Sequence, residues 1–201
     1  MKIGIDIDGV LLDTYPSLIG FFNERYNKSF ELGNLSTHLF TKIYEISFEE
    51  SSKVISDWFD SDEARSLRPV GGAVEGLQSI FDNGHTGFLI TSRPISRRSL
   101  TEGLIQEHFP GLFKKEDLHM LSEFDDPSAQ SKSSFSYKFG IDCLVDDFLD
   151  NCQSFSDYSG KKAIVFNYNS QHGWSNIEVC EYQNEGLFSA TNWNEIPKLI
   201  G

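Results

Sequence analysis

Two aspartates at the end of the first apolar segment are the residues best suited to chemistry. The stretch IGIDIDGVLLD, residues 3–13, places Asp6 and Asp8 two positions apart and follows them with Gly9. Side chains two apart in a strand point the same way, so a strand continuing through Asp8 would project both carboxylates from its carboxyl end. Like charges at this spacing repel unless a cation lies between them. The pattern therefore predicts a site for a metal or a cationic ligand.

Polar residues also end two later apolar runs. Thr91 and Ser92 end the first of these runs, and Asp146 and Asp147 end the second. A carboxylate can attack phosphorus and form a covalent intermediate, and a second carboxylate can donate and accept the protons that move. Magnesium takes hard oxygen ligands, and a hydroxyl can donate to the transferring oxygens. Together these residue types are suited to phosphoryl transfer.

These polar residues can act together only if their strands lie side by side. Short apolar runs predict strands, and apolar residues at helical spacing predict helices between them. This alternation indicates an α/β fold with a Rossmann-like parallel sheet and helices on both faces, in which ligands bind beyond the carboxyl ends of the strands. We therefore expect the three polar sets to meet at one edge of the sheet. The expected strands are 2–7, 86–91, 117–121, 143–145 and 163–166, and the expected helices are 16–29, 48–59, 73–81, 135–139 and 196–200, with a further helix start at 92–94.

Composition limits the partners. The chain has 201 residues, of which 39% are hydrophobic, and its net charge is −13. The length suits one domain with a small insertion, and the charge excludes nucleic acid polymers and anionic membranes as partners.

No apolar run reaches the roughly 18 residues that span a bilayer, and two aspartates interrupt the apolar start, which argues against a signal peptide. Three cysteines at 143, 152 and 180 lack metal-ligand spacing and indicate free thiols, so we expect a cytoplasmic protein. The oligomeric state stays open.

Four separated motifs resemble those of the haloacid dehalogenase-like (HAD) hydrolases, which are mostly phosphatases acting through an aspartyl-phosphate. In the first motif, DIDGV, the resemblance makes Asp6 the nucleophile and Asp8 the general acid and base. In the second, ITSRP, it makes Thr91 the hydroxyl that binds the phosphoryl group, with Ser92 beside it. The third motif is a lysine, and the fourth is LVDD, whose carboxylates hold magnesium.

The resemblance also implies a set of metal ligands. The Asp6 carboxylate and the Asp8 backbone carbonyl would bind the ion together with the Asp146–Asp147 pair. The second acid of such a pair is usually the direct ligand, so the resemblance implies that Asp147 binds the ion and that Asp146 assists it. Asp150 would position this group through a water molecule.

The lysine of the third motif has two candidates. Lys132 is our choice because it precedes a short helix that leads into the strand entry at 140–142, as in relatives, and Lys138 is the alternative because it lies closer to the acidic pair. A lysine adds a point charge to the transferring oxygens. Gly9 permits a tight turn and a close backbone approach to the phosphate.

The resemblance divides the chain into a catalytic core, residues 1–14 and 71–201, and a helical cap, residues 15–70. The combination of DIDGVL, PV-G-A, GH-x5-TSRP and a late FNYN is most similar to the 5′(3′)-deoxyribonucleotidases and their bacterial relatives, which implies a nucleoside monophosphate as substrate. Two features depart from that group. Thr14, followed by Tyr15, stands where the eukaryotic enzymes have an aromatic residue that stacks on the base, and the spacing from lysine to LVDD is longer.

Other interpretations explain less of the sequence. A calcium loop needs further acids where the chain has the apolar run 10–12, and the DxD site of a glycosyltransferase leaves ITSRP and LVDD unexplained. Thr91 and Ser92 could simply cap a helix, and the LVDD acids could form a solvated turn. Asp8 argues against a dehalogenase. A sugar phosphatase, a phosphotransferase or mutase, and a catalytically silent binding protein stay open. We interpret Arg97 and Arg98 as a solvated helix face, and six aromatic residues at 21, 22, 26, 44, 58 and 59 mostly as core of the cap.

Overall fold

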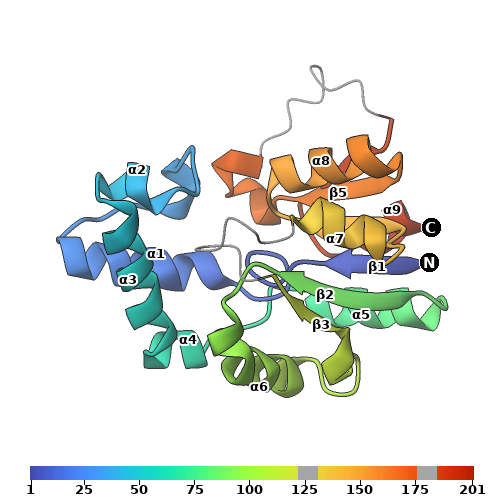
Figure 1. The fold of residues 1–201 in the computed structure, drawn as a ribbon, viewed down its shortest axis with the longest axis horizontal. Helices are drawn as coiled ribbons and strands as arrows, with labels where there is room; N and C mark the ends of the chain where they lie inside the picture. Colours follow the sequence, from blue (N-terminus) through green and yellow to red (C-terminus); the bar gives the residue numbers. More distant parts are fainter. Residues whose placement is uncertain (122–130, 176–184) are drawn as a thin grey trace.

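A computed structural model describes residues 1–121, 131–175 and 185–201. Within this part of the chain, parallel strands form a single sheet in the order β3-β2-β1-β4-β5-β6, which confirms the predicted α/β fold (Figure 1). The central strand, β1, pairs with β2 and β4, and its Ile5 lies opposite Leu89 and Val145. The strands are β1 Lys2–Ile5, β2 Thr86–Thr91, β3 Leu118–Met120, β4 Cys143–Asp146, β5 Lys162–Phe166 and β6 Leu187–Ala190.

Helices cover both faces of the sheet because both faces of its central strands are apolar. Val145 belongs to one buried cluster and its neighbour Leu144 to the other, as alternating side chains of a strand require. Helices α5 Ala73–Asp82, α6 Arg98–His108 and α9 Ile196–Ile200 contribute to the first cluster. Helices α7 Lys132–Lys138 and α8 Leu149–Ser159 contribute to the second.

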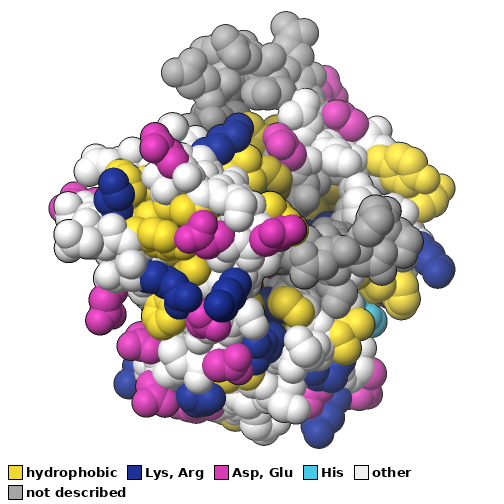
Figure 2. All heavy atoms as spheres, turned by 60° about the vertical axis from the view of Figure 1, so that its left-hand side comes forward, with side chains coloured by type: hydrophobic (Ala, Val, Ile, Leu, Met, Phe, Trp, Pro, Cys, Tyr) yellow, Lys and Arg dark blue, Asp and Glu magenta, His cyan; other side chains and the backbone are white. Residues whose placement is uncertain are grey.

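The chain between β1 and α5 forms a separate group of helices. These are α1 Thr14–Tyr26, α2 Phe40–Tyr44, α3 Phe48–Phe59 and α4 Asp62–Arg65, and they lie on the side toward which β1 points (Figure 1). The buried aromatics Phe22, Tyr44 and Trp58 pack within this group, which agrees with their interpretation as core. Its outer face mixes acidic, basic and apolar side chains (Figure 2). We call residues 15–70 the helical insert.

The structure corrects several expected boundaries. Strand β1 ends at Ile5, two residues early, because the chain turns at once and the amide of Leu11 donates to the carbonyl of Ile7 at 2.9 Å. Pro94 precedes a 3-10 turn at Ile95–Arg97, and the α-helix begins only at Arg98. Helix α7 starts at Lys132, three residues before the expected position.

Strand β6, Leu187–Ala190, was not predicted from the sequence. It is a four-residue edge strand in which only Ala190 is buried, so its sequence lacks the apolar run that marks the inner strands. It pairs with β5 in parallel, so it extends the sheet on the side away from β1. No helix among the described residues combines the length and the apolar character needed to cross a membrane.

Candidate active site

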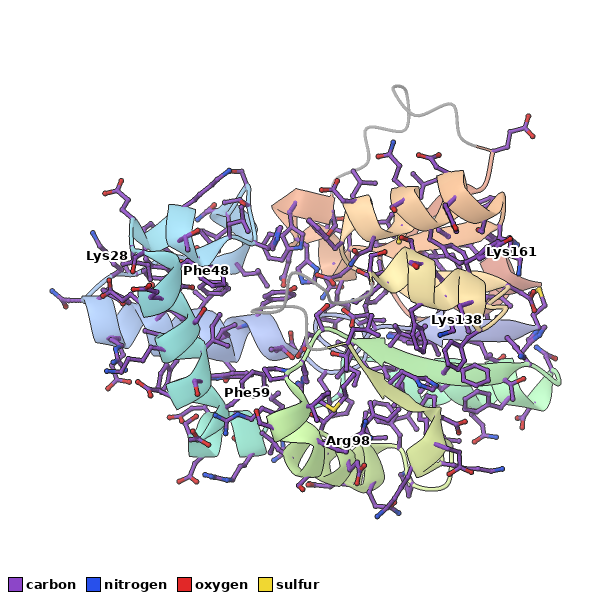
Figure 3. The ribbon with its side chains drawn as sticks, viewed as in Figure 1. Lys28, Phe48, Phe59, Arg98, Lys138 and Lys161 are labelled. Carbon is purple, nitrogen blue, oxygen red and sulfur yellow. The ribbon has the colours of Figure 1, made fainter. Side chains whose placement is uncertain are left out.

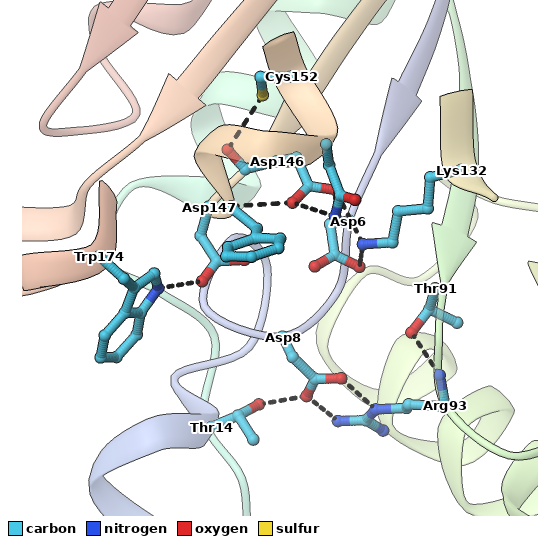
Figure 4. A network of polar contacts seen from close by, with 12 residues as sticks. Asp6, Asp8, Thr14, Thr91, Arg93, Lys132, Asp146, Asp147, Cys152 and Trp174 are labelled. Atoms are coloured by element: carbon cyan, nitrogen blue, oxygen red, sulfur yellow. Dashed lines mark hydrogen bonds and ion pairs between the residues drawn. The ribbon is translucent and has the colours of Figure 1, made fainter. Parts of the chain in front are cut away.

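Three acidic side chains converge at the carboxyl ends of β1 and β4 (Figure 4). Asp6 follows β1 directly, Asp146 is the last residue of β4, and Asp147 comes next. The amide of Asp6 donates to the carbonyl of Val145 at 2.9 Å, which fixes the register that brings them together. Each carboxylate offers an oxygen within 4.8 Å of the other two, and all three side chains are buried. We call this group the three-acid cluster.

A buried lysine contacts the three-acid cluster. Lys132, the first residue of α7, places Nζ 2.9 Å from Oδ1 of Asp6 and 2.8 Å from Oδ2 of Asp146. The Ser131 hydroxyl caps this helix by accepting a hydrogen bond from the amide of Ser134, which secures the turn that carries Lys132. Lys138 is exposed at the other end of α7, away from the helical insert (Figure 3). Of the two candidate lysines, the structure brings only Lys132 to the cluster.

The charges of this group are not balanced. Burial raises the pKa of Asp6 to about 7 although Lys132 opposes the shift, and the nearby carboxylates of Asp146 and Asp8 add to it. Burial and the charges of Asp146 and Asp6 likewise raise the pKa of Asp147 well above its ordinary value. Burial alone would lower the pKa of Lys132, but the carboxylates of Asp146 and Asp6 outweigh it and raise that pKa.

The donor set fits a divalent cation. When the three carboxylates are ionised, the single ammonium of Lys132 leaves two negative charges buried without compensation. Carboxylate oxygens are the ligands that hard divalent cations such as magnesium prefer, and a doubly charged ion would offset this excess.

Asp8 has different surroundings, which corrects the expectation that it projects together with Asp6. Because β1 ends early, the Asp8 carboxylate lies outside the three-acid cluster and faces Arg93. Nε of Arg93 is 2.9 Å from Oδ2 and Nη2 is 2.7 Å from Oδ1, while the hydroxyl of Thr14 donates to Oδ1 at 2.6 Å. Burial raises the pKa of Asp8, but the charge and hydrogen bonds of Arg93 outweigh burial, with help from Thr14, and leave that pKa below its ordinary value.

Gly9 occupies a position that a larger residue could not. Its φ of 76° lies in the left-handed region. A Cβ at this position would lie 2.6 Å from a ring carbon of Tyr15 and 3.1 Å from Oδ2 of Asp147. Glycine therefore lets the loop pass close to the three-acid cluster.

Thr91 and Ser92 end β2, the strand beside β1. Thr91 is 1% exposed, and its hydroxyl accepts a hydrogen bond from the amide of Arg93 at 3.2 Å. This local contact orders the turn after the strand, as in the capping alternative, although the α-helix starts only at Arg98. Ser92 is half-buried in the same turn.

A loop after β5 supports Asp147, and sequence analysis missed it. Nε1 of Trp174 donates to Oδ2 of Asp147 at 3.2 Å, and the hydroxyl of Ser175 donates to its backbone carbonyl. His172 lies with Nδ1 3.9 Å from the same Oδ2, and burial lowers its pKa to about 4, so it is neutral. Asn167 at the strand end fixes the loop by pairing with the backbone of His172. Asn167, a polar residue directly after a buried strand, was the feature of the sequence that could have indicated this loop.

Asp146 is held by residues at the start of α8. Nδ2 of Asn151 lies 3.1 Å from Oδ1 of Asp146, and the amide of Phe148 donates to the same oxygen at 2.9 Å. Asp150, for which we expect a role through a water molecule, is exposed in the same turn. Asn151 is therefore the side chain of α8 that contacts the Asp146 carboxylate at the carboxyl end of β4.

The helical insert contacts the core through arginines after β2. Arg97 pairs with Asp60 and its Nη2 donates to the hydroxyl of Ser56 at 2.9 Å, so it is not the solvated side chain expected from the sequence. The guanidinium groups of Arg93 and Arg97 lie 5.6 and 5.7 Å from the ring of Phe59, on the side of α3 that faces α6 (Figure 3). Arg98 instead pairs along its own helix with Glu102.

Comparison with known proteins places the chain in a family. A family described as 5′ nucleotidase, deoxy (Pyrimidine), cytosolic type C protein matches residues 1–200. The chain belongs to this family. A curated relative from Bacillus cereus named "Putative nucleotidase" is 30% identical over 147 residues, which cover 64% of this chain and 78% of the relative.

Solved structures of HAD proteins share the fold. A HAD family hydrolase from Deinococcus radiodurans, solved with bound phosphate and sodium, matches with a TM-score of 0.67 at 12% identity over 98% of this chain and 96% of its own. A haloacid dehalogenase-like hydrolase from Streptococcus pneumoniae matches with a TM-score of 0.66 at 12% identity over 100% and 98%. At this identity the likeness shows the fold alone. Family membership makes the chain a HAD-type phosphatase, and therefore a hydrolase.

Proposed function

We propose that the chain is a magnesium-dependent phosphomonoesterase that acts through an aspartyl-phosphate on a small phosphorylated metabolite, specifically a nucleoside monophosphate. The position of Asp6 carries the proposal: its carboxylate lies at a strand end 2.9 Å from the Lys132 ammonium, and two further acids lie beside it. A carboxylate in this position can attack phosphorus while the surrounding charges compensate the phosphoryl oxygens. The family name of nucleotidase supports the choice of substrate.

Each half of the reaction uses Asp6 and Asp8 in turn. An oxygen of Asp6 attacks phosphorus, the bond from phosphorus to the ester oxygen breaks, and Asp8 gives that oxygen its proton. In the second half, Asp8 takes a proton from water, which attacks the aspartyl-phosphate and releases inorganic phosphate and free Asp6. Because Arg93 favours the ionised form of Asp8, the first proton has to enter with the substrate, whose phosphate is partly protonated near neutral pH and passes that proton to Asp8. The proton that Asp8 later takes from water leaves with the inorganic phosphate, so Asp8 ends the cycle ionised.

Several groups would bind the phosphate and the ion. Asp6, Asp147 and the backbone carbonyl of Asp8 would hold magnesium with Asp146 in support, and the bound ion supplies neutralisation of the phosphoryl charge. Lys132, the hydroxyls of Thr91 and Ser92, and the backbone of Gly9 would contact the phosphoryl oxygens.

The helical insert, residues 15–70, would act as a cap over a core formed by residues 1–14 and 71–201. It lies beyond the end of β1 that carries the three-acid cluster, and Asp60 of the insert pairs with Arg97 of the core. Closure over a substrate would exclude water and strengthen the electrostatic contacts inside. We place the protein in the cytoplasm because Cys143 and Cys152 are buried free thiols in the described structure, while Cys180 lies outside it.

A screen of phosphorylated metabolites with and without magnesium tests the proposal. We expect hydrolysis that depends on magnesium and favours nucleoside monophosphates. A preference for sugar phosphates would reject the nucleotide substrate but keep the reaction. Absence of hydrolysis across the whole panel, with the protein folded and magnesium present, would reject the proposed function.

A further inference from the structure

Arg93 is a fully buried cation next to the proposed phosphate-binding residues. It follows Thr91 and Ser92 directly, and its side chain is 1% exposed. Because arginine often binds phosphate through its guanidinium, a first hypothesis is that Arg93 binds the substrate phosphate. The geometry does not support that assumption, because the guanidinium is directed toward Asp8 and is closed off from solvent.

The Arg93 side chain is fixed by several elements at once. Nε and Nη2 form a fork with both oxygens of Asp8, at 2.9 and 2.7 Å. Nη1 donates to the hydroxyl of Thr101 on α6 at 3.2 Å, and the ring of Phe59 from the helical insert lies 5.6 Å from the guanidinium. A forked contact determines the plane of a carboxylate as well as its distance, which a single charge cannot do.

We propose that Arg93 is the positioning residue for Asp8 and that it does not contact the substrate phosphate. The inference rests on the proposed function, because it assumes that Asp8 exchanges protons with the ester and with water. Proton transfer requires heavy atoms within about 2.6–3.2 Å, and a displacement of about 1 Å can cost roughly 100-fold in rate. Arg93 supplies the orientation on one side of the carboxylate, and the Thr14 hydroxyl supplies it on the other.

Arg97 offers a matched control. It lies 5.7 Å from the same Phe59 ring and pairs with Asp60 of the helical insert. Arg93 pairs instead with Asp8. Loss of Arg97 therefore disturbs the contact between insert and core without removing the fork on Asp8.

The experiment compares substrates that differ in how much their leaving group needs a proton. In the presence of magnesium, kcat/KM is measured for a nucleoside monophosphate and for 2,4-dinitrophenyl phosphate, whose leaving group departs as a stable anion. Because kcat/KM covers the steps up to departure of the leaving group, Arg93→Gln should lower it by about 100-fold for the nucleotide. We expect a loss below about fivefold for the dinitrophenyl ester and no change in inhibition by inorganic phosphate. Arg97→Gln should affect both esters by the same factor.

A double variant keeps the test valid if Arg93→Gln folds poorly, because Arg93→Gln leaves the partly buried Asp8 carboxylate without its cation. Asp8→Asn combined with Arg93→Gln removes that charge, and it should be no slower than Asp8→Asn alone if Arg93 acts through Asp8. Equal losses on both esters in Arg93→Gln, weaker inhibition by inorganic phosphate, or a further loss in the double variant would each overturn the inference. A wild-type protein that hydrolyses neither ester would instead refute the proposed function.

Discussion

Two carboxylates in one short loop, Asp6 and Asp8, have opposite electrostatic surroundings. Asp6 shares one ammonium with two other buried acids, and burial raises its pKa to about 7. Asp8 has an arginine to itself, and its pKa lies below the ordinary value. Both residues are aspartates in the same loop, so the difference between their pKa values comes from the elements that surround each side chain.

The comparison shows how one motif can prepare two roles. The group around Asp6 carries an excess of negative charge, which suits the cation-binding and phosphoryl-accepting role that we propose for it. The group around Asp8 is balanced by its arginine and oriented by its fork, which suits a residue that moves protons.

The largest expected effect is the loss of the nucleophile. Asp6→Asn should reduce hydrolysis of an aryl phosphate by more than about 1000-fold, because the amide cannot form the covalent intermediate. The rate is measured with magnesium present, and Asp142→Asn is the matched control because Asp142 pairs with Lys161 at the opposite end of β4. Wild-type activity in Asp6→Asn would contradict the assignment.

The second-largest effect should come from removing the buried cations, Lys132 beside Asp6 and Arg93 beside Asp8. Lys132→Met and Arg93→Met should each lower the free energy of unfolding by about 3–5 kcal/mol, because each removes the cation that pairs with a buried or partly buried carboxylate. Magnesium should restore a large part of the loss only in Lys132→Met, since Asp8 lies outside the three-acid cluster. Urea unfolding with magnesium and with a chelator measures this, and equal recovery in both variants would remove the distinction.

The pH dependence of magnesium binding sharpens the comparison. With the ion absent, Asp6 has a pKa of about 7 and that of Asp147 is raised as well, so protons compete with the ion below neutral pH. Affinity should therefore fall as pH decreases through about 7, by roughly tenfold per pH unit for each proton displaced. The increase in Tm caused by magnesium, measured across this range, should shrink toward acid pH in the wild type and in Asp8→Asn alike. An increase independent of pH would argue against binding at the cluster.

The smallest effect should come from the loop after β5. Trp174→Phe removes the donor to Asp147 and should weaken magnesium binding by about tenfold with little change in stability. Trp58→Phe is the matched control, because that indole donates to Ser17 in the helical insert at 3.1 Å. Equal magnesium affinity in both variants would show that the Trp174 contact does not tune the site.

Most of the fold could be predicted because its inner strands are short apolar runs between helical patterns. β1 and β4 are buried on both faces, which the sequence reports directly. β6 could not be predicted, since a half-exposed edge strand has neither an apolar run nor a clean alternation. The shortened β1 was missed because the turn after Ile7 depends on backbone contacts rather than on a residue pattern.

The sequence predicts the site residues that follow strands directly. It does not predict contacts between residues that are far apart in the chain. Asp6, Asp146 and Thr91 follow apolar runs, so strand order alone brings them near one another. The pairing of Asp8 with Arg93 joins positions 85 residues apart and depends on where α6 and the helical insert pack. No local pattern carries that information.

Trapping the covalent intermediate tests the central claim most directly. The wild-type protein is mixed with substrate and magnesium, quenched in acid within one turnover, digested and analysed by mass spectrometry. We predict a phosphoryl group on the peptide that contains Asp6, absent in Asp6→Asn and longer-lived in Asp8→Asn, where its hydrolysis is slowed. Turnover in the wild type with no phosphoryl group on that peptide at any quench time would contradict the account.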